Sequence, residues 1–267
     1  VHVLGNSSDV SEIKKIAKLK KLILIEDTCE SLGSKLKNKN LGTFGDFGTF
    51  SFYYSHQISS GEGGMVICNN KKDYNLLKSL RAHGWSRDGD DHNKYVKKYP
   101  KIDPRFIFIN YGFNVRALEI QAAIAHQQLK KINFLKKNRI YNRSVIIKTF
   151  KNIKRNNHKI HFIESSKNVE CNWFGIPMLV SQKLKKHKQK IVKLLEINGI
   201  ETRPIISGNF LNQPAIKLFG LNKENIKLKN CQDVEDRGFY IGVNSLKTKK
   251  NDLIYVSNVL NKVLDNL

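Results

Sequence analysis

The stretch Leu22-Ile-Leu-Ile-Glu-Asp27 decides the fold class of this chain. Four successive apolar residues end in two carboxylates, and a short amphipathic helix with a capping box at Asp9-Val-Ser-Glu12 is predicted just before them. A continuous apolar run that follows a helix is typical of a strand buried on both faces of a parallel sheet. The stretch therefore predicts an α/β fold.

The rest of the chain continues this alternation and divides into two parts. Up to residue 135 the pattern includes a polar, aperiodic loop at 83–110 and the start of a long helix. After it, strands and helices indicate a smaller α+β unit. We therefore expect a large domain over 1–135 and a small C-terminal domain over 136–267. The predicted strands are 49–54, 65–68, 174–180, 200–206 and 239–243, and the predicted helices are 73–82, 116–150, 183–198 and 252–264.

Composition limits the classes of protein to be considered. The 267 residues are 40% hydrophobic and carry a net charge of +24, which excludes a disordered or fibrous chain. Because the lysines are spread along the whole sequence, we expect a solvated basic surface and no nucleic-acid partner. No apolar stretch reaches the roughly 18 residues of a membrane span, so we expect no membrane partner either.

The four cysteines are scattered along the chain, at Cys29, Cys68, Cys171 and Cys231. No two of them form a C-x-x-C pair, which argues against a disulfide framework and against a zinc site. Isolated cysteines fit a reducing compartment, so we expect a cytoplasmic protein without a metal site.

Two places in the sequence carry chemistry. Asp27 follows a predicted parallel strand, and open α/β sheets bind their ligands at the carboxyl ends of such strands. His56 lies between the strand at 49–54 and the glycine-rich stretch Gly61-Glu-Gly-Gly64, where small residues let backbone approach a ligand. Each residue also has a structural interpretation, Asp27 as a cap and His56 as a packed histidine.

Four stretches of the sequence form a recognisable set: Ile25-Glu-Asp27-Thr-Cys-Glu30-Ser-Leu-Gly33, Gly42-Thr-Phe-Gly45-Asp46, Ser51-Phe to Gly61-Glu-Gly-Gly64, and Tyr111-Gly-Phe-Asn114-Val-Arg116. Together they resemble the DegT/DnrJ/EryC1/StrS family of sugar aminotransferases. The resemblance implies an aspartate aminotransferase-like large domain (the pyridoxal-phosphate fold type I) and a small C-terminal domain. It also implies pyridoxal 5'-phosphate as cofactor and nucleotide-linked keto sugars as substrates.

One departure from the family pattern points to a subfamily. Ordinary members have a lysine where this chain has His56, and that lysine bonds covalently to the cofactor. Imidazole forms no stable bond of this kind, so the cofactor is expected to be held non-covalently as pyridoxal or pyridoxamine phosphate. The exchange resembles the sugar 3-dehydratases, and so do the blocks at 199–214 and 238–242. The resemblance implies 3-dehydration of a nucleotide-linked 4-keto-6-deoxy sugar for surface polysaccharide such as O-antigen.

The cysteine spacing bears on the type of dehydratase. The CDP-sugar type carries an iron–sulfur cluster on closely spaced cysteines. Here the nearest pair in sequence, Cys29 and Cys68, is 68 − 29 = 39 positions apart, and 83–110 contains none. We therefore expect no iron–sulfur cluster and favour the GDP-sugar type, with the sugar and the nucleotide left open.

The resemblance also implies which residues bind the cofactor. Asp27 would pair with the pyridine nitrogen, and Ser51 would bind the phosphate. Glu30 stands where the family has a glutamine near the phenolic oxygen, a departure whose effect the sequence does not define. Asn114 resembles the residue that reaches the phosphate from the neighbouring subunit, which implies a homodimer with shared active sites.

Three residues are expected to act on the substrate. His56 would be the general base, since imidazole titrates near neutral pH. Arg203 is a candidate for binding a carboxylate or phosphate, with a surface salt bridge as the alternative. His83 is expected near the site.

Other outcomes remain open at this stage. L-glutamate is expected as the amino donor that regenerates the cofactor, and a sugar aminotransferase or an inactive relative are the alternatives to a dehydratase. The family's first segment, with its phosphate-binding loop, has no counterpart ahead of Asp27. We therefore expect an N-terminally truncated large domain, and weak cofactor binding by these residues alone.

Overall fold

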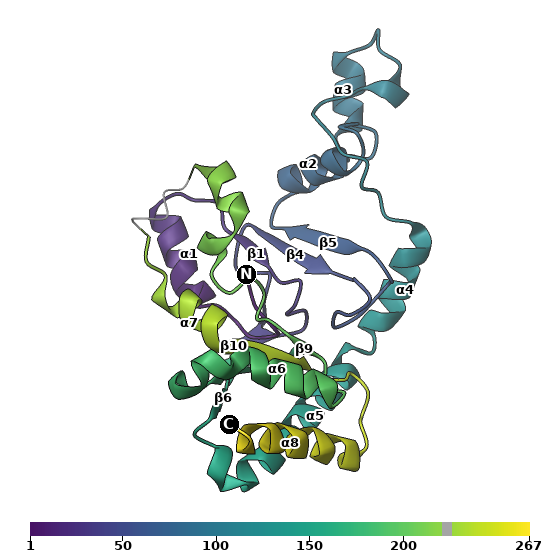
Figure 1. Cartoon of the computed structure of the whole chain (residues 1–267). Coiled ribbons are helices and arrows are strands. Elements are labelled where there is room, and N and C mark those ends of the chain that lie inside the picture. Colours follow the sequence, from purple (N-terminus) through teal and green to yellow (C-terminus); the bar gives the residue numbers. More distant parts are fainter. Residues whose placement is uncertain (221–225) are drawn as a thin grey trace. The chain divides into compact units, whose positions relative to one another are not determined.

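The computed structural model describes residues 1–220 and 226–267, which form two compact units (Figure 1). The first unit contains Val1, Asp9–Cys29 and Lys39–Lys130. The second contains His2–Ser8, Glu30–Asn38 and Lys131–Leu267. The domain boundary expected at residue 135 stays a prediction.

A mixed three-stranded sheet forms the centre of the first unit. Its order is β1-β4-β5, with β1 parallel to β4 and β5 antiparallel to it. Figure 1 shows β4 and β5 side by side, with α2 following β5. The elements of the unit are α1 (Val10–Leu19), β1 (Ile25–Asp27), β3 (Lys39–Asn40), β4 (Phe47–Ser51), β5 (Gly64–Cys68), α2 (Lys71–Arg81), α3 (His92–Lys98), the 3₁₀ turn η1 (Pro104–Phe106) and α4 (Glu119–Leu129).

The helix predicted near Asp9 is confirmed as α1, but the strand predicted after it differs in its start and in its burial. As predicted, the Asp9 side chain caps α1 by accepting a hydrogen bond from the Glu12 amide. The strand, however, begins only at Ile25, whose side chain is 59% exposed, so it is not buried on both faces. The reason lies at Leu24, whose amide donates to the Asp46 carboxylate, so that regular strand pairing starts one residue later.

Two further differences have local causes. β4 ends at Ser51 instead of 54, because the Ser51 hydroxyl accepts a hydrogen bond from the Tyr53 amide and turns the chain. The long helix predicted at 116–150 is two helices, α4 and α5, which break at 130–131. Lys131 has φ −94° and ψ −4°, a conformation that ends the first helix.

The second unit is built on an antiparallel sheet of order β6-β8-β10-β9. Helices α5, α6 and α8 supply most of the apolar side chains that bury one face of it (Figure 1). Ile176, Met178 and Phe239 from the sheet are almost completely buried there. The elements are β2 (Lys35–Leu36), α5 (Ile132–Asn152), η2 (Lys154–Asn156), β6 (Ile160–Phe162), β7 (Val169–Glu170), β8 (Gly175–Val180), η3 (Gln182–His187), α6 (Lys188–Ile197), β9 (Thr202–Arg203), η4 (Phe210–Asn212), η5 (Pro214–Phe219), α7 (Lys229–Arg237), β10 (Gly238–Gly242) and α8 (Lys250–Asp265).

Helix α5 also buries a stripe of polar side chains. Arg139 donates to the Trp173 carbonyl, and Asn142 donates to the carbonyls of Asn244 and Leu246. These buried side chains thus donate to backbone carbonyls of segments far away in the sequence. The polar side chains of the helix therefore bind loops, and its apolar side chains pack in the hydrophobic core.

Among the described residues, no helix combines the length and apolar character required to cross a lipid bilayer. The four cysteines are all free, and the described residues contain no cluster of three or more side chains suited to a metal ion.

Substitution of Asn142 tests the polar stripe. Its amide is completely buried and also accepts from the Thr248 amide at 3.2 Å. Asn142→Ala is expected to lower the free energy of unfolding by about 2–3 kcal/mol, because the Asn244 and Leu246 carbonyls lose their donor and the Thr248 amide loses its acceptor. Urea unfolding measures this, with Asn157→Ala as the control, since Asn157 is exposed and its side chain donates only to the nearby Lys151 carbonyl. Equal losses in both variants would contradict the argument.

Candidate active site

The parallel pairing of β1 and β4 places two of the predicted site residues at the same sheet edge. Asp27 is the last residue of β1 and pairs in register with Thr49 of β4. Ser51 is the last residue of β4, and the chain turns from there into the His56 segment. Ligands of open sheets bind at such an edge.

Glu26 fixes the orientation of β1. Its carboxylate is only 3% exposed and accepts hydrogen bonds from the amides of Gly42, Phe44 and Gly45 at 2.5–2.9 Å. Because successive side chains of a strand alternate between its faces, Asp27 must point away from this loop. Sequence reasoning did not single out Glu26, because two adjacent acidic residues give no indication of which side chain is buried.

The Asp27 carboxylate is held by its neighbours. Its Oδ1 accepts hydrogen bonds from the Cys29 amide at 3.1 Å and from the Thr49 hydroxyl at 3.4 Å. Burial raises the pKa of this carboxyl, but the hydrogen bonds from Cys29 and Thr49 help to outweigh burial, so the net pKa is lowered. Asp27 is therefore ionised at neutral pH.

A tight turn joins Ser51 to His56. The Ser51 hydroxyl accepts from the Tyr53 amide at 3.2 Å, and the His56 amide donates to the Tyr53 carbonyl at 3.0 Å. The half-buried imidazole lies edge-on to the Tyr53 ring, with 6.0 Å between the centroids. The structure thus brings these two predicted residues into one turn.

A second pairing brings His83 and Asn114 together. Ala82 and Asn114 form an antiparallel bridge, and the His83 amide donates to the Phe113 carbonyl at 2.9 Å. His83 has φ +59°, a left-handed conformation that is uncommon outside glycine and is often found at functional sites. The backbones approach so closely that a Cβ on Gly84 would lie 1.9 Å from the Asn110 carbonyl oxygen.

An aromatic and cationic cluster beside His83 was missed by sequence reasoning. The Arg87 guanidinium lies 3.3 Å from the Trp85 ring centroid, and that of Arg116 lies 5.6 Å from it. The His83 ring lies 4.8 Å from the same indole. His83, Trp85 and Arg87 are close together in the sequence, whereas Arg116 reaches the indole through the pairing of 82–86 with 107–115.

Glu30 and Arg203 belong to the second unit. The Glu30 carboxylate accepts from the Leu4 amide at 2.9 Å, and Arg203 pairs with Tyr240 in the sheet. Burial and the charge of Glu30 raise the pKa of Tyr240, while Arg203 lowers it, so both charges lie near the phenol. Arg203 also makes the salt bridge that was its alternative role, with Glu201 at 2.7 Å. Its ligand role stays a prediction.

The family model for the DegT/DnrJ/EryC1/StrS aminotransferases matches residues 1–261. The chain belongs to this family. The resemblance inferred from its motifs is therefore confirmed.

Several curated family members are 3-dehydratases. The chain is 36% identical over 245 residues to GDP-4-keto-6-deoxy-D-mannose 3-dehydratase of Escherichia coli O55:H7, covering 91% of this chain and 61% of that protein. It is 31% identical to dTDP-4-dehydro-2,6-dideoxy-D-glucose 3-dehydratase of Saccharopolyspora spinosa, covering 91% and 54%. GDP-perosamine synthase of Escherichia coli O157:H7 is 30% identical, covering 77% and 50%. The chain thus spans about 61% of the first of these relatives.

Solved structures confirm the predicted fold class. The E. coli GDP-4-keto-6-deoxy-D-mannose 3-dehydratase with bound hydrated pyridoxal phosphate superposes with a TM-score of 0.83 at 32% identity, covering 97% of this chain and 65% of that one. A mutant of the same kind of enzyme with bound GDP-perosamine gives 0.86 at 33% identity, covering 97% and 66%. The family is thus α/β with an aminotransferase-like architecture, as expected.

Replacement of Glu26 tests its role in the site. Glu26→Gln is expected to lower the free energy of unfolding by about 2–3 kcal/mol, because an amide group replaces an oxygen that faces backbone donors. Urea unfolding measures the loss, and Glu12→Gln on exposed α1 is the control, with a change below about 0.5 kcal/mol. A Glu26→Gln protein as stable as the control would show that the loop holds β1 without the carboxylate.

Proposed function

We propose that this chain forms part of a 3-dehydratase that acts on a nucleotide-linked 4-keto-6-deoxy sugar, with GDP-4-keto-6-deoxymannose as the first substrate to test. The observation that carries the proposal is His56, a base at the carboxyl edge of the sheet where ordinary family members have a lysine. The likeness to named 3-dehydratases supports it. The product would enter surface polysaccharide synthesis, and a cytoplasmic location stays a prediction.

The residues of the first unit fit pyridoxal or pyridoxamine phosphate as a non-covalent cofactor. Asp27 is ionised, and a negative charge suits it to hold a proton on the pyridine nitrogen. Ser51 lies at the edge of the sheet with a hydroxyl that can donate to a phosphate oxygen. When bound, the cofactor supplies a ring that accepts electrons from the sugar. The role expected for Glu30 near the phenolic oxygen stays a prediction from the family resemblance.

His56 would move the protons of the reaction. As a base it would accept a proton from the C4′ carbon of a bound cofactor, and as an acid it would donate a proton to the departing C3 hydroxyl. The net reaction replaces that hydroxyl by hydrogen, oxidises L-glutamate to 2-oxoglutarate and releases ammonia. Arg203 and His83 would orient the substrate. A lysine at position 56 could return the proton to the substrate and complete an amino transfer, so a histidine favours elimination.

A sugar aminotransferase is the second candidate function. The similarity to a GDP-perosamine synthase favours it, since the same sheet edge could support amino transfer. The histidine at position 56 argues against it, because no side chain is then available to tether the cofactor. An inactive relative is the third possibility, and loss of activity on substitution of His56 would exclude it.

The proposed enzyme would work as a homodimer with shared sites. Asn114, expected to reach the partner's cofactor phosphate, is exposed on a segment rich in apolar side chains. Tyr111 is 89% exposed, and Phe113 and Val115 are exposed as well. Apolar side chains grouped in this way are typical of an interaction surface.

Product mass tests the reaction. The protein that contains this chain is incubated with pyridoxal phosphate, L-glutamate and GDP-4-keto-6-deoxymannose, and the product is weighed by mass spectrometry. We expect a sugar lighter by one oxygen atom, with His56→Ala slowing its formation at least about a hundredfold. An amino sugar would establish the aminotransferase instead. If the substrate is unchanged, the CDP-linked sugar is tested, and no reaction with either would overturn the proposal.

Mixing inactive variants tests the shared sites. If Asn114 serves the partner's site, a dimer of one His56→Ala and one Asn114→Ala subunit contains one intact site. Random exchange of subunits should then restore about a quarter of wild-type activity. The control is each variant alone, taken through the same subunit-exchange procedure. Activity that stays at the level of the separate variants would show that each subunit binds its cofactor alone.

A further inference from the structure

The segment 204–213 continues the chain directly from Arg203 at the end of β9. Two of its residues have left-handed backbone, Ile206 with φ +50° and Gly208 with φ +61°. This conformation is strained for a β-branched residue such as isoleucine, and it persists only where surrounding contacts impose it. The segment also exposes apolar side chains, since Ile206 is 49% and Phe210 is 50% exposed.

Helix α7 contacts the part of the segment that follows Ile206. Glu235 Oε2 accepts hydrogen bonds from the Asn209 amide at 2.9 Å and from the Asn212 side chain at 2.8 Å. Gln232 Oε1 accepts from the same two side-chain amides at 3.1 and 2.9 Å. A Cβ on Gly208 would lie 2.4 Å from the Cβ of Glu235, so the segment packs directly on the helix.

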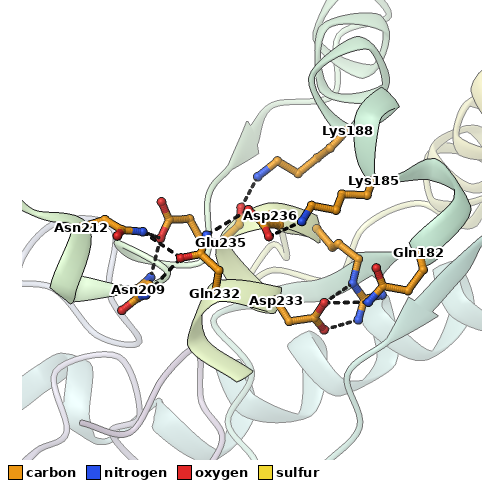
Figure 2. A network of polar contacts seen from close by, with 10 residues as sticks. Gln182, Lys185, Lys188, Asn209, Asn212, Gln232, Asp233, Glu235 and Asp236 are labelled. Atoms are coloured by element: carbon orange, nitrogen blue, oxygen red, sulfur yellow. Dashed lines mark hydrogen bonds and ion pairs between the residues drawn. The ribbon is translucent and has the colours of Figure 1, made fainter. Parts of the chain in front are cut away.

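The opposite side of α7 is anchored to the helices that follow β8. Gln182 donates to Asp233 at 2.9 Å, and Lys185 pairs with Asp236 at 2.5 Å. Figure 2 shows Asn209 and Asn212 on one side of the α7 side chains and Gln182, Lys185 and Lys188 on the other. Two side chains of one helix thus have separate tasks, since Glu235 holds segment 204–213 and Asp233 anchors the helix.

We propose that Glu235, assisted by Gln232, is a positioning residue for substrate binding. It holds segment 204–213 so that Arg203 and the exposed side chains of Ile206 and Phe210 contact the nucleotide sugar. This inference rests on the proposed function. We assign positioning to the glutamate because its Oε2 accepts from both Asn209 and Asn212.

Three variants separate positioning from general stability. Glu235→Ala removes the acceptor of both asparagines, whereas Glu235→Gln keeps an oxygen at that position and should rescue the loss. Asp233→Ala is the matched control, because it removes a carboxylate from the same helix that contacts Gln182 and Arg237 instead. Steady-state kinetics with GDP-4-keto-6-deoxymannose give KM and kcat, and amide hydrogen exchange reports on 206–213.

We expect Glu235→Ala to raise KM about tenfold with kcat within about twofold of wild type, and faster exchange over 206–213. Glu235→Gln and Asp233→Ala should keep a KM near the wild-type value. An unchanged KM in Glu235→Ala, with or without faster exchange, would overturn the inference, as would an equal rise in Asp233→Ala. An inactive wild-type protein would overturn the proposed function, and this inference with it.

Discussion

The buried carboxylate of Glu26 is the interaction on which the first unit's site depends. A charged group with 3% exposure is tolerated only where donors surround it, and here three backbone amides of 42–45 supply them. The same contacts fix the rotation of β1 about its axis. Because the strand alternates, Asp27 is turned to the other face, beside Thr49 of β4.

Short-range hydrogen bonds then determine the chemistry available at this edge. Donors from Cys29 and Thr49 keep the pKa of Asp27 lowered despite its burial, which suits a partner of a protonated ring nitrogen. The turn after Ser51 ends β4 and presents His56 at the same edge. In the proposed function, an imidazole at this position would transfer protons without a covalent link to the cofactor.

The second unit uses buried polar side chains in another way. Along α5, amide and guanidinium groups satisfy backbone carbonyls of distant loops, and on α7 Glu235 and Gln232 satisfy donors of segment 204–213. In both cases a side chain replaces the partner that regular secondary structure would provide. Side-chain hydrogen bonds thus fix irregular segments of this unit.

The sequence by itself determined the α/β class, the helix cap at Asp9, the strands β5, β8 and β10 to within one residue, and the family. Local patterns are sufficient for these, since hydrophobic periodicity, capping and motif spacing depend on neighbours along the chain. Only the tertiary structure decided that Glu26 is buried, that β1 starts at Ile25 and that Arg87 and Arg116 gather at Trp85. Each depends on partners brought close by folding, such as the Asp46 carboxylate at Leu24, and no local pattern encodes which distant group will satisfy a given donor.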